Sequence, residues 1–148
     1  MPRARRPNRM SAYGVPDDDN GLLPWSWAAE RLAKAHNYWI STGGPHASPV
    51  WALWRSGAVV FSCSPTSRKA RELARDPRVV VHLESGDEVV VLEGVAEKFE
   101  ADDSVIAEYE SKYAFRADKG EGWYRVKPAR VLAWTESSYP RDATRFDF

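Results

Sequence analysis

A hydroxyl-rich stretch that leads into two adjacent cations is the part of this sequence best suited to bind a ligand. Residues 61–69 read Phe-Ser-Cys-Ser-Pro-Thr-Ser-Arg-Lys, so an apolar segment passes through a polar loop into Arg68 and Lys69. A helix that begins here would present free backbone N–H groups and the positive end of its dipole. Acidic residues are usual in a first helical turn, so two cations in that place indicate a bound anion such as a phosphate.

A second interpretation of the same cations needs no ligand. Arg68 and Lys69 could pair with Glu72 or Asp76 and form a solvated basic surface. A sheltered charge-assisted hydrogen bond contributes about 1.5–3 kcal/mol. The cations would add that much to the affinity for an anion in the first interpretation and nothing in the second. The residues of this stretch leave both open.

No other residue pattern indicates catalysis by a side chain or a metal site. His36, His46 and His82 show no i,i+4 pairing and have no cysteine partner, so their spacing does not resemble that of metal ligands. The sequence contains no GxSxG, GxGxxG or GxxxxGK[ST] motif. Cys63 follows an apolar segment and is interpreted as a small buried residue. We therefore assign no catalytic residue and no metal ligand.

Composition excludes several classes of protein. The chain has 148 residues, with 21 Lys and Arg against 21 Asp and Glu, which argues against a binder of nucleic acid by bulk charge. A single cysteine excludes an internal disulfide and fits a reducing, cytoplasmic location. No apolar run approaches the ~20 residues needed to cross a bilayer. We expect a cytoplasmic protein with no membrane or nucleic-acid partner.

The chain divides into an arm and one domain. Residues 1–20 are polar, rich in charge and without helical or strand periodicity, which predicts a mobile N-terminal arm. Four arginines in its first nine residues leave a nucleic-acid or partner tail as a weak alternative. Residues 21–148 are predicted to form a single domain.

The predicted elements are mainly strands. Apolar spacing, turn residues and caps predict helices over residues 24–35 and 68–74 and after Asp102 or Asp103, and strands over residues 38–42, 46–54, 58–62, 78–84, 88–99 and 123–134. Pro49 predicts an edge or a bulge in its strand, and Gly94 predicts a bend. About six antiparallel strands are most economically closed into a small barrel flanked by short helices, with a sandwich as the alternative.

These motifs together resemble those of a known family. The order and spacing of the matching residues are similar to those of the pyridoxamine 5'-phosphate oxidase-like flavin/deazaflavin oxidoreductases, and above all to the small actinobacterial type that uses the deazaflavin coenzyme F-420. The similarity covers about residues 24–148 and rests on Tyr38-Trp39-Ile40-Ser41-Thr42, Gly44-Pro45-His46, Pro49-Val50-Trp51, Trp54, Phe61-Ser62, Ser67-Arg68-Lys69-Ala70-Arg71, Leu73, Asp76-Pro77-Arg78-Val79, Glu93-Gly94-Val95-Ala96-Glu97, Tyr113, Gly122-Trp123, Lys127-Pro128, Ala133-Trp134 and Ala143-Thr144-Arg145-Phe146.

The resemblance implies a six-stranded antiparallel split β-barrel of the FMN-binding type and a homodimer with two cofactor sites at the subunit interface. In the family's pattern the coenzyme phosphate is held by Ser67, Arg68 and Lys69, while Pro49, Val50, Trp51 and Ser62 flank the ring or its ribityl chain. Two features depart from that pattern. The turn Gly43–Gly44 is short and lacks a basic residue before the proline, and Glu72 stands where an amide is common.

The implied reaction is hydride transfer between coenzyme F-420 and a small electron-poor substrate such as an enone or quinone. The cofactor supplies that chemistry, and the protein positions it and excludes water. Trp51, Trp54 and Trp134 are candidates for apolar walls. The alternatives are an FMN-dependent oxidase or reductase of the same fold, a non-catalytic flavin- or deazaflavin-binding protein, and a haem-binding relative.

Overall fold

The chain folds as a mainly β structure with helices at its margins. The computed structural model describes residues 1–8 and 13–148. In these residues the elements are β1 (Arg3–Arg5), α1 (Trp25–Lys34), β2 (Tyr38–Thr42), β3 (His46–Val50), β4 (Leu53–Arg55), β5 (Ala58–Cys63), α2 (Arg68–Arg75), β6 (Arg78–His82), β7 (Glu88–Phe99), α3 (Asp103–Tyr113), β8 (Gly122–Thr135) and β9 (Thr144–Asp147).

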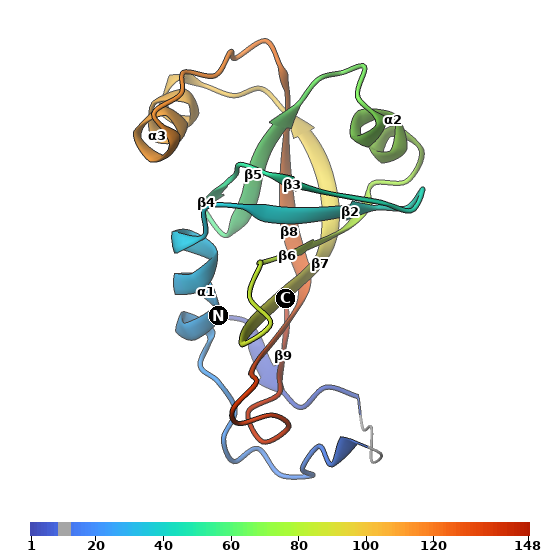
Figure 1. Cartoon of the computed structure of the whole chain (residues 1–148), viewed down its shortest axis with the longest axis vertical. Helices are drawn as coiled ribbons and strands as arrows, with labels where there is room; N and C mark the ends of the chain where they lie inside the picture. The colour runs from blue at the N-terminus through green and yellow to red at the C-terminus, as the bar shows by residue number, and fades with distance from the viewer. Residues whose placement is uncertain (9–12) are drawn as a thin grey trace.

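All strand pairs are antiparallel and belong to one sheet. Among the described residues the strand order is β1-β9-β8-β7-β6-β2-β3, and β5 joins β8 on one side and β4 on the other. The first half of β8 pairs with β5 and its second half with β9, while β7 pairs along its whole length. The β2–β3 hairpin crosses the long strands β7 and β8 at a steep angle (Figure 1). The sheet therefore curls around a core.

The predicted mainly β chain with three helices is confirmed, but the predicted count of six strands is wrong. The described residues form nine strands. The strand expected over residues 46–54 is broken at Trp51 and Ala52 into β3 and β4, which pair with different partners. No pairing joins β3 to β4 in the described part of the chain, so hydrogen bonds do not close the sheet there. Pro49 lies in β3, which among the described strands pairs only with β2 and is therefore an edge strand, as the missing donor of proline predicts.

The sheet bends where a glycine was expected to bend it. The register between β7 and β8 shifts at Glu93 and Gly94. A Cβ atom on Gly94 would lie 2.3 Å from the carbonyl oxygen of Lys127, so the strands approach too closely for a larger residue. The irregularity predicted at Gly94, a bulge or bend, is confirmed by this register shift.

The N-terminal segment is corrected by the structure. Residues Arg3–Arg5 form β1 and pair with β9, and the Arg5 guanidinium lies 2.5 Å from the Asp147 carboxylate. The prediction of a mobile arm is therefore wrong for these residues. Arg9, part of the same arginine cluster, lies outside the described residues.

Arg6 fastens this segment to the end of the chain. Its side chain is 8% exposed and donates to the carbonyl oxygens of Asp18, Asn20, Arg141 and Ala143, at 2.7 Å for Asp18 and 3.2 Å for Ala143. Local sequence patterns could not predict these contacts, because the two ends meet only in the folded chain.

The core lies on the inner face of the sheet. Ile40, Val81, Leu92 and Val131 are fully buried there and belong to one apolar cluster. A second cluster lies under α3, whose Val105, Ile106, Tyr109 and Tyr113 are buried as their shared helical face predicts.

Candidate cofactor-binding site

The helix predicted after the hydroxyl-rich loop is α2. Ser67 caps it, because its hydroxyl accepts a hydrogen bond from the Ala70 amide at 3.2 Å. The loop is tightened by a hydrogen bond from the Ser67 amide to the Ser64 carbonyl at 2.9 Å. At its other end Asp76 forms the C-cap, where the Asp-Pro step predicts a stop. α2 lies beside the turn of the β2–β3 hairpin (Figure 1), where Arg68 donates to the Pro45 carbonyl.

The two cations at this helix start have different partners. The Lys69 Nζ atom donates to the Ser48 hydroxyl of β3 at 2.9 Å, and within the described residues no carboxylate lies within ion-pair distance of it. The Arg68 Nε atom donates to Glu72 at 2.8 Å, and its Nη2 atom donates to the Pro45 carbonyl at 3.2 Å. The ion pair considered for this stretch thus exists for Arg68, although its Glu72 partner is buried, whereas Lys69 has no carboxylate partner among the described residues.

Glu72 points into the hairpin turn. Its side chain is 9% exposed and accepts hydrogen bonds from the Thr42 hydroxyl at 3.1 Å, from Arg68 and from the Gly44 backbone N–H. Burial raises the pKa of the Glu72 carboxyl, whereas the hydrogen bonds from Arg68 and Thr42 lower it. The lowering effects together are larger, so the net shift of the pKa is downward. Glu72 therefore acts as an anion that holds the turn.

The ring-flanking residues of the resemblance lie along β3 and just beyond it. Pro49 is exposed, Val50 is half-buried against the core, and Trp51 follows the strand with 39% of its surface exposed. Ser48 contacts Lys69, and Trp51 follows Ser48 by three positions, which span about 10 Å of extended chain. A phosphate at the start of α2 and a ring near Trp51 are compatible with one elongated cofactor.

Ser62 and Trp51 occupy different surroundings from the cation cluster. Ser62 is half-buried in β5 and pairs with Trp123 of β8. Trp51 contacts α3: its ring stacks on Tyr113 with centroids 4.8 Å apart and planes 5° apart. The structure brings Ser67, Arg68 and Lys69 together with Ser48 and the hairpin, and it places Trp51 at the other end of β3.

Sequence reasoning missed several residues near this site. Ser48 is not among the predicted site residues, although alternation along residues 46–50 places it on the same face as His46 and Val50. Tyr113 was assigned to the buried face of its helix, and its contact with Trp51 had no signal in the sequence, because the two residues are 62 positions apart.

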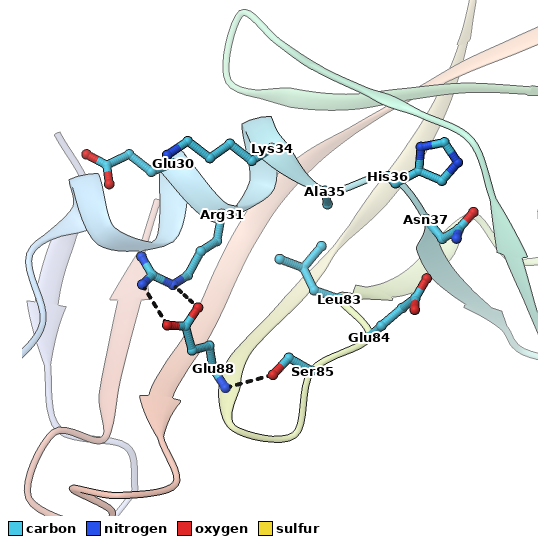
Figure 2. A pocket seen from close by; sticks show the side chains of 10 residues that line it. All are labelled: Glu30, Arg31, Lys34, Ala35, His36, Asn37, Leu83, Glu84, Ser85 and Glu88. Carbon is cyan, nitrogen blue, oxygen red and sulfur yellow. Dashed lines mark hydrogen bonds and ion pairs between the residues drawn. The ribbon is translucent and has the colours of Figure 1, made fainter. Parts of the chain in front are cut away.

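A cavity of about 540 Å³ lies between the end of α1 and the turn that joins β6 and β7 (Figure 2). Its lining comprises Glu30, Arg31, Lys34, Ala35, His36, Asn37, Leu83, Glu84, Ser85 and Glu88. None of the predicted cofactor residues lines it. The Arg31 guanidinium spans its wall to Glu88 with hydrogen bonds of 2.9 and 3.1 Å. His36 links the cavity rim to the candidate site, because its ring meets Trp51 edge-on with centroids 5.9 Å apart.

The described residues contain no group of three or more His, Cys, Asp or Glu side chains placed to hold a metal ion. They also contain no helix with the length and hydropathy needed to span a bilayer. Cys63 is buried at the end of β5.

Comparison with known proteins identifies the family. The model of the pyridoxamine 5'-phosphate oxidase family matches residues 28–135, most of the chain. The chain belongs to this family. No curated protein sequence matches this pyridoxamine 5'-phosphate oxidase family member.

Solved structures share its fold. A heme-binding protein from Mycobacterium smegmatis is 24% identical, with a TM-score of 0.63 over 82% of this chain and 58% of that chain. An FAD-binding protein from the same organism is 18% identical, with a TM-score of 0.58 over 86% of this chain and 99% of that chain. An F-420 reductase is 19% identical, with a TM-score of 0.58 over 69% of this chain and 94% of that chain.

This pyridoxamine 5'-phosphate oxidase family member departs from the family's sequence pattern at the Gly43–Gly44 turn and at Glu72, and these two places are in contact. A Cβ atom on Gly44 would lie 1.8 Å from the Oε1 atom of Glu72, so the carboxylate occupies the space that the glycine leaves open. The short turn and the carboxylate therefore depend on each other. Because Glu72 is directed into the turn, its charge is compensated by Arg68 and by the donors of Thr42 and Gly44.

Proposed function

We propose that this protein is an oxidoreductase that transfers a hydride between coenzyme F-420 and a small electron-poor organic substrate. The observation that carries the proposal is the start of α2, where Lys69 lies against Ser48 without a carboxylate partner in the described residues. In a chain of this family, that arrangement suits the single phosphate of a deazaflavin or flavin coenzyme.

The residues of the proposed site fit the coenzyme by their chemistry. Ser67 offers a hydroxyl, Arg68 a planar guanidinium and Lys69 a mobile ammonium at one helix N-terminus. Pro49, Val50 and Trp51 supply an apolar margin for a planar ring, and Ser62 a hydroxyl for the ribityl chain. The bound coenzyme supplies the hydride chemistry, while these residues bind it, orient it and exclude water.

FMN is the alternative cofactor, because it presents one phosphate to the same cations. The FAD-binding structural neighbour supports a flavin as much as the F-420 reductase supports a deazaflavin. The heme-binding neighbour keeps a non-catalytic binding function as a further candidate.

We also propose that the protein is a homodimer, with cofactor sites completed by the second subunit. The outer face of the sheet carries a row of residues that pair directly across strands and are all half-buried or exposed: Pro49, Trp39, His82, Val91 and Leu132. A second copy of this face would cover its apolar members. Sedimentation equilibrium tests this: a monomer at micromolar concentration refutes the dimer.

Titration with purified coenzymes tests the proposed function. The protein is mixed with coenzyme F-420 and, separately, with FMN, and the cofactor fluorescence is followed. Micromolar binding of F-420 with weaker FMN binding is the expected result, followed by oxidation of reduced F-420 when enones or quinones are added. Binding of FMN alone assigns the alternative cofactor. Failure of both cofactors to bind refutes the oxidoreductase.

A further inference from the structure

Trp51 is an exposed aromatic residue between two strands that have no pairing with each other in the described part of the chain. It follows β3, precedes β4 and is 39% exposed. A large side chain at a strand break has many accessible orientations unless other groups restrict it. Three aromatic rings do so: Tyr113 stacks on its face, while His36 and Phe115 contact it edge-on at 5.9 and 6.2 Å.

The backbone next to Trp51 is held by the last turn of α3. The Tyr113 hydroxyl accepts a hydrogen bond from the Ala52 amide at 2.9 Å and lies 2.7 Å from the Ala52 carbonyl and 2.8 Å from the His36 carbonyl. Lys112 donates to the same Ala52 carbonyl at 2.9 Å. Both backbone groups of Ala52 are therefore satisfied by side chains of α3 instead of by a neighbouring strand.

Tyr113 is itself rigid. It is 8% exposed, packs against Tyr109 at 4.9 Å, and belongs to the apolar cluster under α3. Burial raises the pKa of its phenol to about 12, so it stays protonated and can donate a hydrogen bond at physiological pH. A rigid, protonated tyrosine can fix both the backbone and the ring of its partner.

We infer that Tyr113 is a positioning residue for the cofactor ring, because it stacks on one face of Trp51 and leaves the exposed indole surface to contact the coenzyme. The inference rests on the proposed function. It adds a residue that does not touch the cofactor itself but positions Trp51, which does. Offset aromatic stacking favours parallel planes, and the 5° angle between Trp51 and Tyr113 has that geometry. The stack determines where the indole lies before the coenzyme arrives, which lowers the ordering cost of binding.

A double-mutant cycle tests the inference. The affinity for coenzyme F-420 is measured by fluorescence titration for wild type, Tyr113→Leu, Trp51→Leu and the double variant. We expect Tyr113→Leu to weaken binding about fivefold to tenfold in the wild-type background, and less than about twofold when Trp51 is already replaced. Tyr113→Phe keeps the stacked ring and loses only the hydroxyl that holds Ala52, so it should weaken binding less than Tyr113→Leu. Ile106→Ala, a buried change on the same helix, controls for general loosening of α3.

The outcomes separate this inference from the proposed function. If wild type binds neither coenzyme, the proposed function fails. If wild type binds and Trp51→Leu binds equally well, Trp51 does not contact the ring, and both this inference and the placement of the ring are refuted. If Trp51→Leu is weak but Tyr113→Leu is equally harmful in both backgrounds, Tyr113 does not act through Trp51, and the inference alone is overturned.

A second readout needs no coenzyme. In protein labelled with 5-fluorotryptophan, the fluorine resonance of Trp51 is assigned by its loss in Trp51→Phe. We expect Tyr113→Leu to shift or broaden that resonance more than Tyr113→Phe does, and Ile106→Ala to leave it in place. An unchanged resonance in Tyr113→Leu would show that the indole does not depend on the stack.

Discussion

Replacing Lys69 by methionine isolates the charge that the proposed phosphate site depends on. Methionine keeps most of the aliphatic length and removes the ammonium group. In the structure Lys69 is half-buried, and its ammonium donates to the Ser48 hydroxyl at 2.9 Å and has no carboxylate partner among the described residues. A sheltered hydrogen bond to a charged group contributes about 1.5–3 kcal/mol, so we expect the Kd for coenzyme F-420 to rise about 10- to 150-fold.

Arg68 should behave differently because it already has a protein partner. Its guanidinium is bonded to Glu72 and to the Pro45 carbonyl, so less of its donor capacity is available to a phosphate. We expect Arg68→Met to weaken binding less than Lys69→Met and to lower the stability of the hairpin turn more. The structure thus separates two adjacent cations that the sequence treats alike.

The matched control is Arg71→Met on the same helix. Arg71 is exposed and donates to the Thr66 carbonyl at 2.8 Å, so this variant makes the same change of net charge. Affinities are measured by fluorescence titration with F-420 at two salt concentrations, and thermal unfolding confirms that each variant is folded. A Kd for Lys69→Met within about twofold of wild type, or equal to that of Arg71→Met, would refute the phosphate site at α2.

Three further predictions concern stability. Gly94→Ala places a Cβ atom 2.3 Å from the Lys127 carbonyl oxygen and should lower the free energy of unfolding in urea by about 1–3 kcal/mol. Burial lowers the pKa of Lys112 to about 8, whereas its value in the unfolded chain is near 10.4. Between these two pH values the unfolded chain binds more protons than the folded chain, so the free energy of unfolding should rise with pH. Lys112→Met should remove that rise. Arg6→Met removes a guanidinium that joins four backbone carbonyls and should lower Tm by about 4–8 °C, corresponding to ~2 kcal/mol.

Each of these has a control on the same chain. Gly86→Ala adds a Cβ atom that meets no atom within 4 Å, so it should leave the unfolding midpoint close to that of wild type. Lys34→Met removes an exposed ammonium and should keep the wild-type pH profile. Arg3→Met alters an exposed position of β1 and should cost less than Arg6→Met. Equal effects in any variant and its control would contradict the corresponding contact.

Local patterns were sufficient for much of the fold. Alternation and turn residues predict β7 with the bounds that the structure shows, and apolar spacing predicts the buried face of α3. Hydroxyl caps, the Asp76-Pro77 stop and the bend at Gly94 follow from the conformational preferences of single residues, which act within a few positions of the chain. The stretch from Ser67 to Lys69 likewise indicates an anion site before any contact is known.

Distant contacts decided the rest. β1 forms because the two ends of the chain meet and β9 offers it a partner, and the break at Ala52 exists because α3 supplies hydrogen bonds from 60 residues away. The direction of Glu72 depends on the space at Gly44, and the difference between Arg68 and Lys69 follows from that direction. Sequence by itself determined which residue types stand at the start of α2 and along β3, because composition and local preference are written in the chain. Only the tertiary structure decided which cation has no carboxylate partner among the described residues and which tyrosine supports Trp51, because both depend on the packing of segments that are far apart in sequence.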